Sequence, residues 1–331
     1  MLSVIGEALI DLVRDDDGEQ AGAGGSRSFR AHPGGSPYNV AIGLARLGQP
    51  TLLQARFSGD AFGQQLRAHA GAQGVDLSAA VSAAEASTLA VVGLDAARNA
   101  TYDFYVNGTA DWQWSAAELA LAPPDVSWIH TGSLASWTEP GASVIGSFLR
   151  DRQTLSSPPV ISFDPNIRPL LTPDHGWAVA AVERLVGLAD VVKASAEDLD
   201  WLYPGTQIAE VLRAWRALGA DLAVVTDGSS GAHAITRDGT VLFSAARAIE
   251  VVDTVGAGDA FMAGLINAIV RRGLVVATAE ADQLQPVLDE AILVAALTCQ
   301  RAGADPPTGA ELAAAWDARP TTAGSTAQPT G

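Results

Sequence analysis

The sequence predicts an α/β fold whose core is a mostly parallel β-sheet with helices on both faces. Apolar segments of strand length alternate with amphipathic segments of helix length, which is the order that right-handed βαβ crossovers produce. The length of 331 residues suits one large α/β domain or a domain with an insertion, and 48% hydrophobic residues can form a sizeable core.

The first third of the chain combines core elements with two segments that look separate from the core. Residues 2–8 are predicted to form the first strand. Residues 14–32 are polar, glycine-rich and poor in core formers, so we expect an insertion there. Residues 88–94 and 101–106 alternate in polarity around a polar turn and predict a hairpin. Three further elements are expected, a helix at 37–48, a strand at 51–56 and a helix at 60–71.

Beyond residue 125 the alternation is regular. Strands are predicted at 126–130, 160–163, 190–193 and 222–226, and helices at 141–153, 175–187, 196–203 and 207–218. A hairpin at 232–236 and 240–246 turns at Arg237-Asp238-Gly239 and would lie at one sheet edge. Long helices follow at 257–272 and 283–302. Residues 319–331 are rich in Thr, Ala, Gly and Pro and predict a disordered tail.

Charge and composition argue against several classes of partner. The net charge of −17, from 20 basic and 37 acidic residues, disfavours nucleic acid and anionic membranes. Cys299 is the single cysteine, so no internal disulfide is possible and a reducing compartment, the cytoplasm, is expected. The histidines show no metal-ligand spacing, and no apolar run of about 18 residues predicts a membrane span.

Residues 253–265, Asp-Thr-Val-Gly-Ala-Gly-Asp-Ala-Phe-Met-Ala-Gly-Leu, are the most informative run. Gly256-Ala257-Gly258 form a turn before an apolar helix, and the free N–H groups at a helix start can bind an anion such as phosphate. Asp259 would repel that anion, so its presence needs a reason. It either caps the helix or takes a proton from a hydroxyl that attacks a phosphoryl group.

A second glycine pair and several polar residues extend this candidate site. Gly34-Gly35 precede a helix, and Asn39 offers a donor and an acceptor to a polyhydroxyl ligand, although an ordinary helix-entry loop would look the same. Ligands of parallel sheets bind beyond the carboxyl ends of the strands. The polar residues that follow predicted strands are Asp11, Asp164, Asn166, Lys193 and the run Thr226-Asp227-Gly228.

Rival nucleotide and hydrolase motifs are absent from the sequence. It contains no GxxxxGK[ST] run, which excludes a P-loop enzyme, and no GxGxxG after a predicted strand, which disfavours a Rossmann dinucleotide site. It also lacks a Gly-x-Ser-x-Gly elbow, which lowers the odds of an α/β-hydrolase.

These motifs resemble those of the ribokinase-like (PfkB) carbohydrate kinase family. Gly34-Gly35-x-x-x-Asn39 and residues 253–259 resemble its two signatures and stand in the family's order. Residues 6–11, 162–169, 192–199 and 226–232 look like the corresponding runs of fructokinases. The resemblance covers residues from about 2 to 316. It implies a ribokinase-like three-layer sandwich over residues 1–318, with a small β-sheet lid built from residues of about 12–32 and 86–109.

The resemblance also implies an activity and roles for individual residues. The family transfers the γ-phosphate of ATP to a sugar hydroxyl, and it implies that Asp259 is the general base and Gly256, Ala257 and Gly258 the anion hole. Sugar hydroxyls would be held by Asp11, Gly34, Gly35 and Asn39, and the nucleotide by Thr226, Gly228, Gly231 and Gly258, with Lys193 near its phosphates. Mg²⁺ would bridge the phosphates, with Glu197 or Asp198 on the metal side. Asp253 and the carbonyl of Val255 resemble the start of a monovalent-cation site for K⁺.

Departures from the family pattern bear on the substrate. Relatives that act on acidic sugars often carry an Arg after an aromatic pair in the lid, whereas Val106 follows Phe104-Tyr105 here, which favours a neutral ketose such as fructose. Arg168 could still bind a carboxylate or a phosphate. An aromatic cluster could stack on a sugar or form lid core; its members are Tyr102, Phe104, Tyr105, Trp112 and Trp114.

Other functions remain open at this stage. Within the kinases, the alternatives are a 2-keto-3-deoxygluconate kinase, a ribokinase and a nucleoside kinase. Outside them, the alternative is an inactive regulator that binds a sugar or a nucleotide, which the intact Asp259 and glycine turn disfavour. Because lid-mediated dimers occur in the family, a homodimer is expected.

Overall fold

The computed structural model describes residues 1–14, 28–94, 100–172 and 174–318. Its centre is an eight-stranded sheet in the order β14-β13-β12-β11-β10-β9-β1-β4. The parallel strands of this sheet are β1 (Leu2–Ile5), β4 (Thr51–Gln54), β9 (Trp128–Gly132), β10 (Val160–Asp164), β11 (Val191–Ser195) and β12 (Leu222–Asp227). The antiparallel hairpin of β13 (Gly231–Ile235) and β14 (Val241–Ala245) extends it at one edge.

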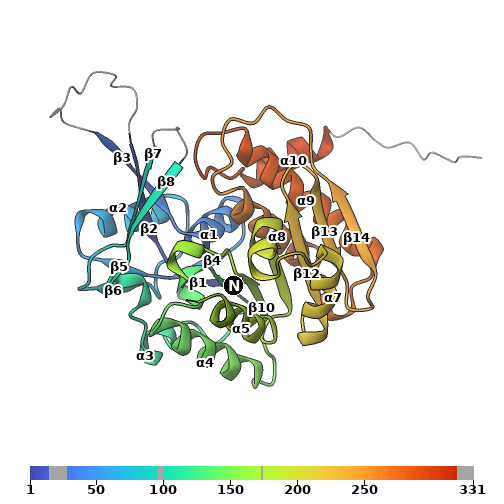
Figure 1. The fold of residues 1–331 in the computed structure, drawn as a ribbon, viewed down its shortest axis with the longest axis horizontal. Coiled ribbons are helices and arrows are strands. Elements are labelled where there is room, and N and C mark those ends of the chain that lie inside the picture. Colours follow the sequence, from blue (N-terminus) through green and yellow to red (C-terminus); the bar gives the residue numbers. More distant parts are fainter. Residues whose placement is uncertain (15–27, 95–99, 173, 319–331) are drawn as a thin grey trace, which may run out of the picture.

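Helices cover both faces of this sheet and create two hydrophobic cores (Figure 1). One layer contains α1 (Ser36–Arg46), α2 (Ala61–Ala72), α8 (Ala257–Arg272), α9 (Ala281–Cys299) and α10 (Gly309–Asp317). The other contains α4 (Gly141–Gln153), α5 (His175–Val186), α6 (Ala196–Leu202) and α7 (Ile208–Leu218). Both strand faces are apolar because each is buried against a helix layer, as expected for a parallel sheet.

A second sheet projects from one end of the molecule (Figure 1). It has four strands in the order β3-β2-β7-β8, formed by β2 (Leu9–Arg14), β3 (Phe29–Gly34), β7 (Leu89–Leu94) and β8 (Ala100–Tyr105). The short strands β5 (Arg56–Ser58) and β6 (Val81–Ala83) pair beside it, and α3 (Ala116–Leu119) follows β8. The chain therefore separates a large parallel core from a small sheet.

Most predicted elements of the core are confirmed, and the predicted bounds of the first strand are wrong. The predicted strand over 2–8 ends at Ile5, and β2 begins at Leu9 in the other sheet, because the chain leaves the core at Gly6. The segment 14–32 was predicted as an insertion away from the core, and its described end agrees, since residues 29–34 pair with β2 in the small sheet. The predicted tail, 319–331, lies outside the described residues. Among the described helices, none is both long and apolar enough to cross a membrane.

Candidate active site

The glycine turn before α8 is shaped for close approach by a ligand. Gly256 is the N-cap residue and has a left-handed backbone with φ of 73°. A Cβ at this position would lie 2.5 Å from the Cβ of Ala304, so no other residue fits without movement. Ala257 and Gly258 begin the helix, and Asp259 stands in its first turn. The turn thus directs free helix N–H groups outward beside a carboxylate.

Two side chains of α1 hold the Asp259 carboxylate. Ser36 Oγ donates to Asp259 Oδ1 at 2.7 Å, and Asn39 Nδ2 donates to Oδ2 at 2.8 Å. Burial raises the pKa of Asp259, while these two donors and the charges of Lys193 and Arg168 oppose the rise. Asn39 was predicted to hold sugar hydroxyls, and in this structure its amide contacts Asp259.

Lys193 lies behind the turn as a buried cation. Its Nζ is 2.9 Å from Asp164 Oδ2 and would be 3.0 Å from a Cβ placed on Gly258. Burial alone would lower the pKa of Lys193, but Asp164, Asp198 and Asp259 together raise it above its usual value. A permanent positive charge therefore stands directly against the predicted anion hole.

Asp11 and Arg168 define the other side of the site. Asp11 was predicted to follow a strand of the main sheet, but it lies inside β2 of the small sheet. Its Oδ2 is 2.3 Å from where a Gly34 Cβ would be, and a Cβ on Gly35 (φ of 106°) would be 2.6 Å from the Glu7 carbonyl oxygen. Burial raises the pKa of Asp11 to about 6, with the charge of Arg168 lowering it and that of Asp259 raising it. The two carboxylates and this guanidinium thus share one electrostatic environment.

The residues assigned to the nucleotide lie along the end of β12 and the start of β13. Thr226 is the fifth residue of β12, and its Oγ1 donates to the carbonyl of Ala194 at 3.4 Å. Gly228 has φ of 45° and is exposed with open space around its Cα. A Cβ on Gly231 would lie 2.1 Å from the carbonyl oxygen of Ser244, so this glycine is required for hairpin packing.

Residues 1–310 match the family described as pfkB family carbohydrate kinase. The chain belongs to this family. It is 36% identical over 269 residues to a fructokinase of Rhizobium leguminosarum bv. trifolii, covering 81% of this chain and 79% of that protein. The fructokinase of Xylella fastidiosa, solved with bound ATP, aligns with a TM-score of 0.82 at 28% identity, covering 95% and 97% of the two chains. A double mutant of the Vibrio cholerae O395 fructokinase, solved with fructose, ADP and a potassium ion, aligns at 0.80 with 28% identity and the same coverage.

Two of the three acidic residues assigned to metals in this pfkB kinase, Asp198 and Asp253, already accept hydrogen bonds from backbone N–H groups. Asp198 is the third residue of α6 and forms a capping box with the N-cap residue Ser195: its Oδ2 accepts from the Ser195 N–H and hydroxyl, and its Oδ1 accepts from the Ile167 N–H at 2.7 Å. Glu197 is exposed. Asp253 accepts from the N–H groups of Val255 and Gly303. Over the residues that the structure describes, no group of three or more His, Cys, Asp or Glu side chains could hold a metal ion by itself.

The aromatic cluster of this kinase is divided between the core and the small sheet. Trp112 and Trp114 are 2% and 3% exposed and belong to a hydrophobic core, so they are not sugar-stacking residues. Asp11, Ala90 and Phe104 are paired across three neighbouring strands, so their side chains lie on one face of the small sheet. Tyr105 pairs instead with Leu89, the residue before Ala90. Tyr105 thus lies on the sheet face opposite Asp11, which does not support its predicted sugar contact. Phe104 shares the face of Asp11.

Sequence reasoning missed three buried polar residues of this kinase. Ser36 is one, because a serine at a helix start is ordinary and only the fold brings it to Asp259. Glu7 and Asp111 are the others, and both are 1% exposed. Asp111 Oδ1 accepts a hydrogen bond from the Ala8 N–H at 2.8 Å, and Glu7 Oε2 accepts one from the Ala135 N–H at 3.1 Å. These two acids stand at the junction between β1 and β2.

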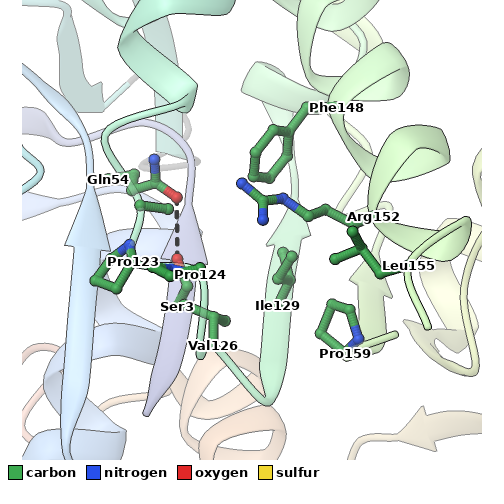
Figure 2. Close-up of a pocket in the computed structure, with 11 residues that line it drawn as sticks. Ser3, Gln54, Pro123, Pro124, Val126, Ile129, Phe148, Arg152, Leu155 and Pro159 are labelled. Atoms are coloured by element: carbon green, nitrogen blue, oxygen red, sulfur yellow. Dashed lines mark hydrogen bonds between the residues drawn. The ribbon is translucent and has the colours of Figure 1, made fainter. Parts of the chain in front are cut away.

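A separate hollow opens at the amino ends of the strands of the main sheet (Figure 2). Its walls include Ser3, Ile129 and Pro159, which lie at the amino ends of β1, β9 and β10, and the Arg152 guanidinium stacks on Phe148 at 4.6 Å. The glycine turn and Asp259 lie beyond the carboxyl ends of the strands, so this hollow is not part of the candidate active site.

Proposed function

We propose that this chain is an ATP-dependent kinase that phosphorylates a hydroxyl of fructose or a closely similar neutral ketose. The observation that carries the proposal is the Asp259 carboxylate beside a left-handed glycine turn, with the buried Lys193 cation behind that turn. This arrangement combines a proton acceptor with an anion-binding surface, which are the two requirements for moving a phosphoryl group to an alcohol.

The proposed reaction needs few chemical steps from the protein. The sugar hydroxyl oxygen forms a bond to the γ-phosphorus as the bond from that phosphorus to the ADP oxygen breaks, and Asp259 accepts the hydroxyl proton. The N–H groups at the turn and Lys193 stabilise charge on the moving phosphoryl group. Asp11, Gly34, Asn39 and Arg168 position the sugar.

We assign the nucleotide side to Thr226, Gly228 and Gly231. Mg²⁺ would neutralise phosphate charge when bound, and it commonly uses one or two carboxylates, substrate phosphates and water. Asp198 fits such a role only through water, because both of its oxygens accept protein hydrogen bonds. We also propose that Asp253 and the carbonyl oxygen of Val255 supply the first ligands of a K⁺ site.

The electrostatics of the sugar side favour a neutral ketose. Asp11 would repel an acidic sugar, and Val106 supplies no compensating cation in the small sheet. Arg168 is a charged residue that would favour an acidic sugar such as 2-keto-3-deoxygluconate. It lowers the pKa of both Asp11 and Asp259, so we assign it mainly to balancing these carboxylates.

We also propose a homodimer through the small sheet and a location in the cytoplasm. Phe29 and Tyr105 are 44% and 61% exposed and lie on the same face of this sheet, so a second copy packed on that face would cover both. A cytoplasmic enzyme would have access to ATP and would keep Cys299 reduced.

ADP release over a panel of sugars tests the proposed activity. Purified protein with ATP, Mg²⁺ and K⁺ should release ADP with fructose, more slowly with ribose, a nucleoside or 2-keto-3-deoxygluconate, and very slowly without a sugar. Asp259→Asn is the control for a contaminating kinase, because loss of the base should lower kcat by about 10²- to 10⁴-fold. Absence of sugar-dependent ADP release across the panel would reject the proposal.

A further inference from the structure

Ser36 contacts the proposed base, Asp259, although the two residues are far apart in the sequence. It is the first residue of α1 and is 7% exposed, and its hydroxyl donates to Asp259 Oδ1 at 2.7 Å. Asn39, one helical turn later, donates to the other oxygen at 2.8 Å. The two donors thus come from one face of α1 and reach a carboxylate carried by α8.

This contact acts on both the charge and the orientation of Asp259. A buried carboxylate prefers to be protonated, and a protonated base cannot accept the sugar proton. The Ser36 hydroxyl opposes that preference because its hydrogen bond favours the ionised form. A carboxylate with one donor on each oxygen also cannot rotate without breaking a bond, and each oxygen keeps a second lone pair for the substrate hydroxyl.

We propose that Ser36 is a positioning residue for catalysis, which keeps Asp259 ionised and fixes the plane of its carboxylate. This role rests on the proposed kinase function but concerns a residue outside the predicted site. Ser36 touches neither the sugar nor the phosphate in this proposal. It acts only through Asp259.

The pH dependence of Ser36→Ala tests this role. Loss of one donor should raise the pKa of Asp259, so the acid limb of kcat/KM for the sugar should move by about one pH unit toward higher pH. Because less of the base is ionised, kcat/KM at a fixed pH on that limb should fall about tenfold, whereas KM for ATP should stay within about twofold. Substitution to Ala removes only a hydroxyl, so the fold should tolerate it.

Ser244→Ala is the matched control. Ser244 is also 7% exposed, and its hydroxyl donates to Asp289 Oδ1 at 2.6 Å, but it lies in the edge strand β14. The control should lose similar thermal stability and keep the wild-type acid limb. An unmoved limb in Ser36→Ala, or equal movement in both variants, would overturn the proposal.

A readout without turnover separates this proposal from the proposed activity. The carboxyl carbon of Asp259 can be titrated by ¹³C NMR in protein labelled at aspartate, with Asp259→Asn identifying the signal. We expect its midpoint to rise in Ser36→Ala and to stay in place in Ser244→Ala. If no sugar is phosphorylated, the proposed function fails while this titration still decides the role of Ser36, and an unchanged midpoint overturns it.

Discussion

At the residue scale, the candidate site places a buried cation among acidic groups. Lys193 and Asp164 are 4% and 1% exposed and form an ion pair of 2.9 Å. Asp164 Oδ1 also accepts from the Asn166 N–H at 3.1 Å, which fixes the loop that carries Arg168. Burial raises the pKa of Asp164 to about 6 even with Lys193 beside it, so this pair is costly to bury. Such a cost is expected where a charge serves the reaction.

The cost and the function of this pair can be separated by mutation. Lys193→Met leaves Asp164 buried without its partner, and we expect a loss of about 3–5 kcal/mol in the free energy of unfolding. The double variant Lys193→Met with Asp164→Asn removes both charges and should recover most of that loss. Activity should stay at least about 10²-fold low in both variants, because neither has a cation behind the glycine turn.

Urea unfolding and ADP release measure these two effects side by side. If activity returned with stability in the double variant, Lys193 would be a structural residue and the anion hole would work through backbone groups alone.

Single residues also show what could be read from the sequence. Asp259 and its glycines could be predicted because a carboxylate beside an anion-binding turn needs a chemical reason. Ser36 could not, because Ser36 and Asp259 are 223 positions apart and their meeting depends on how α1 packs against α8. The predicted sugar contact of Tyr105 is not supported by the pairing register, because a shift of one residue in β8 moves a side chain to the other face.

At the element scale, α8 has a left-handed glycine at each end. Gly256 is the N-cap residue with φ of 73°, and Gly273 is the C-cap residue with φ of 62°. A Cβ on Gly273 would meet nothing within 4 Å, whereas one on Gly256 would collide with Ala304. The helix therefore provides its own control for the effect of backbone conformation.

Alanine at the two ends should separate backbone strain from loss of the anion hole. Both Gly256→Ala and Gly273→Ala force a side chain into the left-handed region, which should lower the free energy of unfolding by about 1–2 kcal/mol, and the collision with Ala304 should add to the loss in Gly256→Ala. Only Gly256→Ala should also displace the turn and lower kcat, by about tenfold or more. Thermal unfolding and ADP release decide this. Equal activities in the two variants would argue against a catalytic role for the turn.

Elements differ in how far their sequences predict them. The strands β9 to β12 are apolar and regularly spaced, so their positions were predicted within a few residues. The strand β3 contains Pro33 and Gly34, has no apolar periodicity, and exists because β2 offers it an edge to pair with. The helix α10 was missed, although its Thr308–Glu311 capping box is visible in the sequence.

At the scale of the whole molecule, several of the acidic side chains are buried in the interior. The described carboxyl groups whose pKa is raised chiefly by burial are Glu7, Asp11, Asp111, Asp164, Asp190 and Asp259. Most of them lie around the site or at the junction with the small sheet, where Asp111 reaches a pKa of about 7. Net charge predicted an acidic surface, but which acids are buried depends on the fold.

These groups should give stability and activity opposite dependences on pH. A carboxyl group with a raised pKa binds its proton more tightly in the folded chain, so its contribution to stability is complete below the unfolded pKa and is lost as pH rises through the folded pKa. For Asp11, Asp164 and Asp111 this window runs from about 4 to about 7. Burial lowers the pKa of His130 to about 3 and also lowers that of His69, which opposes the trend below pH 6.5 but involves two groups against six.

We therefore expect the melting temperature to rise as pH falls from 8 to 5.5, while kcat/KM falls once the pH approaches the raised pKa of Asp259. Calorimetry and ADP release in the same buffers measure both quantities. Asp111→Asn is the control, because an amide cannot titrate in this range and this residue lies outside the site. The melting temperature of this variant should change less than that of the wild type between pH 6 and 8, and the acid limb of its activity should be unchanged. A melting temperature that rises with pH over this range would mean that the buried carboxyl groups ionise as easily as exposed ones. In that case burial could not be what raises the pKa of Asp259, and the donors from α1 and the neighbouring cations would have to determine its ionisation alone.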